Sequence, residues 1–188
     1  MNDLTLLAAL LRGPAYGYAL KKTAGLIFGS KAMHSNVVYP LLKKFMKNGW
    51  VEQRSAQGHR GQTRKQYRIT ATGRNYLFEQ LESFSQQDAG DDGAFLFRVA
   101  LFDVLPKQRR LAILAARKSF LTSRSQQLAE LREVTQPKSF GAVAFDRVQS
   151  VVQDERRWLQ QLERDLETKK GDLKCTQLRT HQATPHRS

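Results

Sequence analysis

The sequence predicts a mainly α-helical chain that contains one short β-hairpin near residue 60. Apolar residues recur at helical spacing over residues 4–48 and again over residues 95–166. Between them, residues 50–70 change to a strand-like pattern that small polar residues and glycines interrupt. Hydrophobic residues make up 40% of the chain and charged residues 26%, which is the balance of a folded domain.

Two short helices are expected before residue 30. Residues 4–11 are almost entirely apolar, so they predict a short buried helix. Gly13-Pro14 should end it, because proline disfavours a helical conformation at the residue before it. Residues 15–28 carry an apolar stripe close to a 3.6-residue period and predict the second helix, which Gly29 should end.

A third helix is predicted over residues 35–48, with one apolar face and one basic and polar face. Val38, Leu42 and Phe45 belong to the apolar face. Pro40 lies in the second turn, where it removes a backbone hydrogen bond, so we expect a later start or an irregular first turn.

The hairpin follows directly. Residues 50–54 and 64–70 predict two strands, and residues 55–63 predict a long basic loop between them. Thr70 or Thr72 is placed to cap one more helix after the second strand.

The C-terminal half predicts helices only. Residues 86–93 are rich in Gly and Asp and predict a linker. Helices are expected over 95–105, from Pro106 to about 134, and over 140–169, with a break at Pro137. These patterns divide the chain into four parts: a first domain at 1–85, the linker at 86–93, a helical domain at 94–170 and a disordered tail at 171–188.

Charge narrows the class of partner. Lys and Arg number 31 against 17 acidic residues, a net charge of +14. Residues 1–85 hold 13 of these basic residues and only 4 of the acidic ones. Such an excess favours nucleic acid over an anionic membrane surface. The single cysteine, Cys175, excludes an intrachain disulfide. No apolar run spans a bilayer and the N-terminus lacks the basic region of a signal peptide, so we expect a cytoplasmic protein.

Three helices followed by a two-stranded hairpin are the element order of a winged helix-turn-helix. In this arrangement the third helix enters the major groove of DNA, and the hairpin, or wing, lies against the flanking backbone or minor groove. The polar side chains of the third helix then contact bases and phosphates. The candidate DNA-binding residues are Ser35, Asn36, Tyr39, Lys43, Lys44, Lys47, His59, Arg60, Arg64 and Lys65.

Residues 4–85 resemble the PadR family of bacterial transcriptional regulators. Three motifs carry the resemblance, in the family's order and spacing: Leu10–Lys22 (LLRGPAYGYALKK), Val38–Glu52 (VYPLLKKFMKNGWVE) and Arg64–Gly73 (RKQYRITATG). The family tolerates Tyr-Pro inside the recognition helix, which answers the difficulty of Pro40. One departure is Ser35-Asn36-Val37, where the family often has a small residue after the serine.

The length of the chain is similar to the family branch with a helical C-terminal domain. The resemblance implies that these helices join two copies of the chain, and a leucine stripe along them agrees with this. The candidate dimerisation residues are Phe95, Phe97, Leu101, Phe102, Leu159, Leu162 and Leu166. The resemblance further implies a homodimeric repressor that binds an inverted repeat, with recognition helices about 34–36 Å apart. A phenolic or drug-like small molecule would act as its effector.

Several residues admit a second interpretation. Tyr39 is a core residue or a DNA contact, and it lies off the apolar face, which favours contact. Trp158 is a wall of an effector pocket or a packing residue, and packing is the more common role.

The histidines and Cys175 lack metal-ligand spacing, and no constellation typical of an enzyme or a cofactor site is present. A winged-helix module that binds protein is the alternative function, but the third helix has no acidic residue to favour it. A membrane-surface protein is disfavoured because acidic residues are interspersed along the C-terminal helices.

Overall fold

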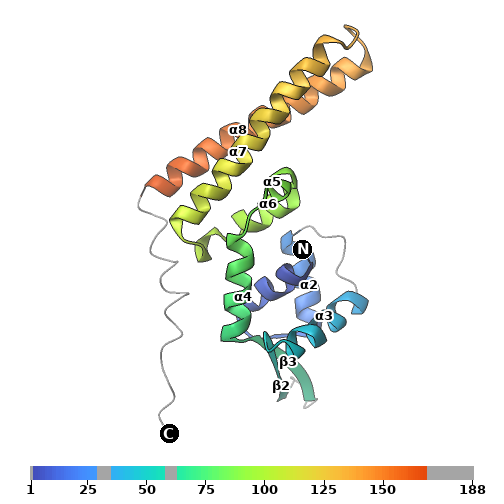
Figure 1. The fold of residues 1–188 in the computed structure, drawn as a ribbon. Helices are drawn as coiled ribbons and strands as arrows, with labels where there is room; N and C mark the ends of the chain where they lie inside the picture. The colour runs from blue at the N-terminus through green and yellow to red at the C-terminus, as the bar shows by residue number, and fades with distance from the viewer. Residues whose placement is uncertain (1, 29–34, 58–62, 169–188) are drawn as a thin grey trace. The chain divides into compact units, whose positions relative to one another are not determined.

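The computed structural model describes residues 2–28, 35–57 and 63–168. The chain divides into two compact units. The first is Met1–Ser83 with Leu96–Arg98, and the second is Phe84–Phe95 with Val99–Ser188. Figure 1 shows the first unit as helices and a hairpin, and the second as helices only.

The first unit has the predicted order of helices followed by a hairpin. Its helices are α1 (Asn2–Ala9), a 3-10 turn (Leu10–Arg12), α2 (Gly17–Phe28), α3 (Ser35–Lys47) and α4 (Ala71–Glu82). Its strands are β1 (Ala15–Tyr16), β2 (Val51–Gln57) and β3 (Thr63–Ile69), in the antiparallel order β1-β3-β2. Thr70 caps α4 by accepting a hydrogen bond from the Gly73 N–H at 3.0 Å, as predicted.

Two local predictions in this unit are wrong. Ala15 and Tyr16 are not helical, because they follow Pro14 in extended conformation and pair with Tyr67 and Gln66 on the free edge of β3. The strands also run further into the predicted loop, since the ladder continues from the pair Val51–Ile69 to the pair Gln57–Thr63. In both places backbone pairing outweighs local propensity.

Helix α3 begins at Ser35, and Pro40 lies inside it. The core beneath it forms from the apolar faces of four helices and the inner face of the hairpin. Its most buried members are Leu6, Leu7, Leu10, Leu20, Val38, Leu42, Phe45, Val51, Ile69, Leu77 and Leu81.

A tight junction joins α3 to β2 and α4. Gly49 adopts a left-handed φ of 69°, its N–H donates to the Met46 carbonyl, and the Trp50 N–H donates to the Phe45 carbonyl. This pair of bonds is a Schellman motif, and the Phe45 and Trp50 rings, 5.8 Å apart, supply its usual apolar contact. A Cβ on Gly73 would lie 2.1 Å from the Trp50 carbonyl oxygen, so α4 reaches this junction only with glycine there.

The segment predicted as a linker, residues 86–93, is almost entirely helical. It forms α5 (Gln86–Gly90) and the start of α6 (Asp92–Val99). Ser85 caps α5 with a capping box, in which Ser85 and Asp88 each accept the other's backbone N–H. The single helix predicted over 95–105 is also interrupted, since α6 ends at Val99 and a separate 3-10 turn follows at Phe102–Val104.

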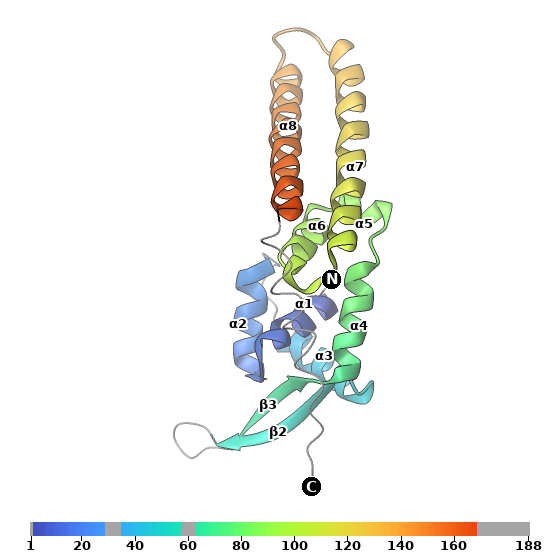
Figure 2. The same cartoon turned by 90° about the vertical axis from the view of Figure 1, so that its left-hand side faces the viewer.

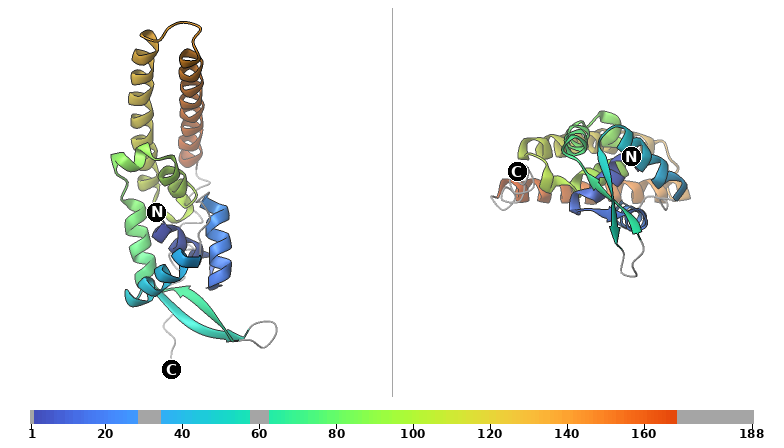
Figure 3. Two further views of the ribbon diagram at one scale, coloured as in Figure 1. Left: turned by 90° about the vertical axis from the view of Figure 1, so that its right-hand side faces the viewer. Right: turned by 90° about the horizontal axis from the view of Figure 1, so that it is seen from below.

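Two long helices, α7 (Lys107–Glu133) and α8 (Phe140–Glu167), dominate the second unit. They run side by side, as Figures 2 and 3 show. Pro106 precedes α7, and Ser139 caps α8 by accepting the Ala142 N–H at 3.1 Å. Both helices were predicted from the sequence with nearly these bounds.

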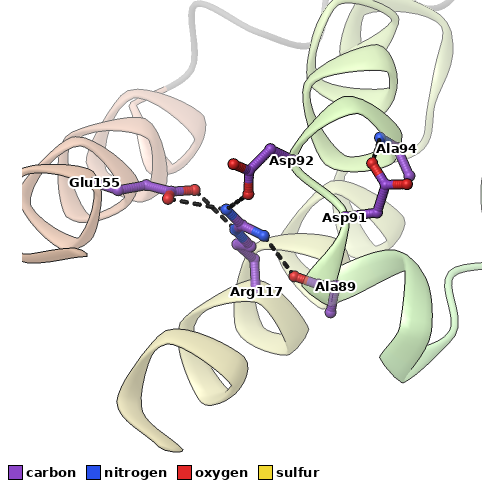
Figure 4. Close-up of polar contacts among 6 residues, drawn as sticks. All are labelled: Ala89, Asp91, Asp92, Ala94, Arg117 and Glu155. Carbon is purple, nitrogen blue, oxygen red and sulfur yellow. Dashed lines mark hydrogen bonds and ion pairs between the residues drawn. The ribbon is translucent and has the colours of Figure 1, made fainter. Parts of the chain in front are cut away.

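A buried arginine connects the helices of this unit (Figure 4). Arg117 on α7 is 1% exposed and donates to the Ala89 carbonyl on α5, Asp92 on α6 and both carboxylate oxygens of Glu155 on α8. Burial lowers the pKa of Arg117, but the hydrogen bonds to Glu155 and Asp92 outweigh it and raise the pKa overall. The guanidinium also lies over the Phe95 and Phe120 rings, 5.2 and 5.5 Å from their centroids.

None of the helices described here combines the length and the apolar character that a membrane span requires.

Candidate nucleic-acid interface

The outer face of α3 is polar, basic and free of acidic residues. Asn36, Lys43 and Lys47 are exposed and recur at intervals of seven and four residues, so they lie along one side of the helix. This side lies opposite Val38, Leu42 and Phe45, which are at most 1% exposed. Because the core fixes the buried face, it also fixes which side chains point outward.

Lys44 differs from the other two lysines on the helix. Its ammonium lies 2.9 Å from the Asp3 carboxylate at the start of α1. This hydrogen bond and the charge of Asp3 raise the pKa of Lys44. No corresponding ion pair is recorded for Lys43 or Lys47 in the part of the chain that the structure describes. The free positive charge of α3 therefore lies at Lys43 and Lys47.

Tyr39 bridges α3 and the start of α2. A Cβ on Gly17 would lie 3.0 Å from Tyr39 Cε1, so the ring covers the glycine backbone while the side chain stays 51% exposed. Tyr67 on β3 is buried. Burial raises the pKa of the Tyr67 hydroxyl, and the electrostatic interaction with Tyr39 raises that pKa further. Tyr39 therefore packs with one part of its ring and exposes another, and its contact with DNA stays a prediction.

The hairpin places a row of arginines on the face that points away from the core. Tyr67 and Ile69 of β3 are buried, so the alternate residues Arg64 and Arg68 point outward. Arg54 on β2 shares this outer face, since Glu52 lies opposite Arg68 and Arg54 opposite Gln66. The side chains of Arg54 and Arg68 both reach Glu52, at 3.2 and 3.9 Å. The candidate list omitted these two arginines, although the period-two alternation of the strands could have indicated them.

The remaining wing candidates are placed only in part. Lys65 is exposed on β3. His59 and Arg60 lie outside the described residues, as does the side chain of Ser35, the first residue of α3. Their role in DNA binding stays a prediction.

The predicted dimerisation residues lie largely inside the single chain. Phe95, Phe97, Phe102 and Leu159 are at most 8% exposed, and Leu101, Leu162 and Leu166 are half-buried. Trp158 is 38% exposed and meets Phe95 edge to face, with ring centroids 6.0 Å apart. It therefore packs, at least along one edge.

A pocket of about 350 Å³ lies between α5 and α7. Its walls are Gln86, Ala89, Ala116, Ser119, Phe120 and Ser123. Trp158 is not among them. Two serine hydroxyls and one amide lie beside a single aromatic ring in this lining.

These features define a winged helix-turn-helix, a class of DNA-binding domain, followed by a helical unit. Residues 6–79 match the model of the "Transcriptional regulator PadR-like family". Residues 6–79 therefore form a domain of this family, whose members are transcriptional regulators.

The chain is similar to several solved structures of transcriptional regulators. A protein of Thermoplasma acidophilum assigned as a transcriptional regulator is 30% identical over 42% of this chain and 75% of its own, with a TM-score of 0.39. Bacillus subtilis PadR in complex with operator DNA is 17% identical over 87% of this chain and 98% of its own, with a TM-score of 0.40. The same protein in complex with p-coumaric acid is 17% identical over 88% of this chain and 94% of its own, with a TM-score of 0.35. No curated protein matches the chain.

Proposed function

We propose that this regulator binds a specific operator as a homodimer and represses transcription. The observation that carries the proposal is the outer face of α3, where Asn36, Lys43 and Lys47 are exposed on a helix without acidic residues. A helix of this kind fits the major groove, where amide and ammonium groups bind base edges and phosphates.

The wing extends the same surface. Arg64 and Lys65 are exposed on β3, and the outward arginines of the hairpin supply further donors for phosphate oxygens. Contacts of this type orient the domain on the duplex, while Asn36 and Tyr39 are the candidates for base recognition.

A homodimer would present two copies of α3 to one duplex. Its two-fold symmetry would match an inverted repeat, with half-site centres about one helical turn, or about 34–36 Å, apart. Repression then follows if the operator overlaps the promoter.

We further propose a small-molecule effector of the helical unit, of the phenolic or drug-like class. The pocket between α5 and α7 is the site for it, because Phe120 offers a ring face and Ser119 and Ser123 offer hydroxyls. The first probe is p-coumaric acid, which B. subtilis PadR binds. Addition of this acid should weaken operator binding by the wild-type chain and leave a Ser119→Leu variant, which fills the pocket, bound.

The decisive experiment measures binding to the DNA upstream of the protein's own gene. Fluorescence anisotropy at several salt concentrations, with scrambled duplex as competitor, should show tight binding that weakens steeply with salt, at two protomers per duplex. Lys43→Ala and Lys47→Ala should each reduce the slope of log K against log salt by about 0.9, because each removes one phosphate contact.

Lys138→Gln is the matched control. Lys138 is exposed in the turn between α7 and α8, so the same loss of charge there should leave the slope unchanged. Equal affinity for the upstream and scrambled duplexes would contradict specific recognition at this site. An unchanged slope of log K against log salt in both α3 variants would show that α3 does not contact the DNA.

A further inference from the structure

Acidic residues are scarce in the winged-helix unit, and two of them pair with its basic side chains. Residues 1–85 contain four acidic residues, which are Asp3, Glu52, Glu79 and Glu82. Asp3 binds Lys44 of α3, and Glu52 binds two arginines of the hairpin. Both acids therefore contact cations of the two elements that we propose to bind DNA.

Glu52 lies between two arginines on the outer face of the hairpin. The ladder places it directly opposite Arg68, and Arg54 follows two residues later on the same face. Both guanidinium groups approach the same carboxylate oxygen, Glu52 Oε1, which lies 3.2 Å from Arg54 Nη2 and 3.9 Å from Arg68 Nη1. One carboxylate thus offsets part of the charge of two arginines.

These ion pairs contribute little to the stability of the fold. The side chains of Arg54, Arg68 and Glu52 are 67%, 54% and 39% exposed, so water screens their charges. The pairs act instead on any anion that approaches this face. An arginine that binds a phosphate must leave the carboxylate or hold it near the phosphate, which repels it. Either event lowers the affinity of the surface for a polyanion.

We propose that Asp3 and Glu52 limit the affinity of the winged-helix unit for the phosphate backbone of any duplex. The proposal rests on the proposed function, because it takes α3 and the hairpin as the surface that faces DNA. It goes beyond that function by assigning a role to two residues that do not themselves bind DNA. Phosphate contacts carry no sequence information, so operator and unrelated DNA are affected equally.

The test measures binding of the full-length chain to a scrambled duplex by fluorescence anisotropy over a range of salt concentrations. Glu52→Gln removes the charge and keeps the size of the side chain. The slope of log K against log salt should steepen by at least about 0.9, because at least one arginine becomes free to bind a phosphate. At ~0.1 M salt this change corresponds to binding that is about eightfold tighter. In the double variant Asp3→Asn with Glu52→Gln the two changes of slope should add, since the pairs share no partner.

Two controls separate this effect from a change in net charge. Glu79→Gln removes an exposed acidic residue of α4 and should change the affinity by less than about twofold, because solvent screens a charge that has no phosphate nearby. Glu52→Gln should also leave the slope unchanged when Arg54 and Arg68 are already replaced by glutamine, because neither arginine remains to be freed. Urea denaturation should show equal stability of Glu52→Gln and the wild-type chain.

The outcomes for scrambled and upstream duplexes are distinct. A rise in affinity by the same factor for both, with their ratio constant within about twofold, supports the proposal. Weaker binding or an unchanged slope in Glu52→Gln overturns it, as does an equal rise in Glu79→Gln or a rise for the upstream duplex alone. Wild-type binding to the upstream DNA that is no tighter than to scrambled DNA contradicts the proposed function, while the scrambled duplex still decides the role of the two acids.

Discussion

Gly73 is the residue at which the winged-helix domain tolerates least change. A methyl group there would lie 2.1 Å from the Trp50 carbonyl oxygen, which accepts the Thr70 N–H at 2.9 Å. Because the clash is with backbone, no side-chain rotation relieves it. Gly73→Ala should therefore lower the free energy of unfolding by about 3 kcal/mol in urea denaturation. Asn75→Ala, exposed on the same helix, is the control, and equal stability of the two variants would exclude this close approach.

Asp3 pairs with one of the three lysines of α3 and so limits the free positive charge on this helix. Its carboxylate holds the Lys44 ammonium at 2.9 Å and raises the pKa of that lysine. Asp3→Asn should free Lys44 for a phosphate and steepen the slope of log K against log salt by about 0.9. Glu79→Gln removes an equal charge from α4 and serves as the control. A slope that stays the same in Asp3→Asn would place Lys44 outside the DNA interface.

At the scale of single elements, the second unit depends on one buried side chain from α7. Arg117 binds groups on α5, α6 and α8, and two of these are carboxylates that lose their partner when it is removed. Arg117→Leu should destabilise the chain by about 3 kcal/mol in chemical denaturation, because the remaining groups cannot pair. Arg124→Leu, a half-buried position two turns further along α7, should change stability little. Similar losses of stability in the two variants would mean that the hydrogen bonds of Arg117 contribute no specific stabilisation.

The same elements show what the sequence could and could not predict. Helices α3, α7 and α8 carry apolar residues at helical spacing, and Ser139 caps α8, so their bounds were predicted to within a few residues. Strand β1 was missed because only the edge of β3, distant in sequence, makes Ala15 and Tyr16 extended. Helix α5 was taken for a linker because of its Gly and Asp content, although Ser85 and Asp88 form a capping box.

Across the whole molecule, the sequence predicted the kind of site. It did not predict which of the candidate residues are ion-paired or buried. Composition placed most of the charge excess in the first unit, and the apolar face of α3 predicted which lysines point outward. The pairing of Lys44 with Asp3 requires a contact 41 positions apart, which no local pattern reveals. For the same reason, residues such as Phe95 and Leu159 looked suited to a partner chain, whereas neighbouring helices of the same chain bury them.

The junction around Gly49, Trp50 and Thr70 has a consequence for how this regulator can diverge. The end of α3, the start of β2 and the start of α4 share hydrogen bonds there, including the Thr70 hydroxyl donating to the Gly49 carbonyl at 2.6 Å. Recognition helix and wing are consequently held at one fixed angle. If α3 and the hairpin read the operator as proposed, a lineage that acquires a new operator must replace outward side chains such as Asn36, because reorienting either element would break the junction that both share.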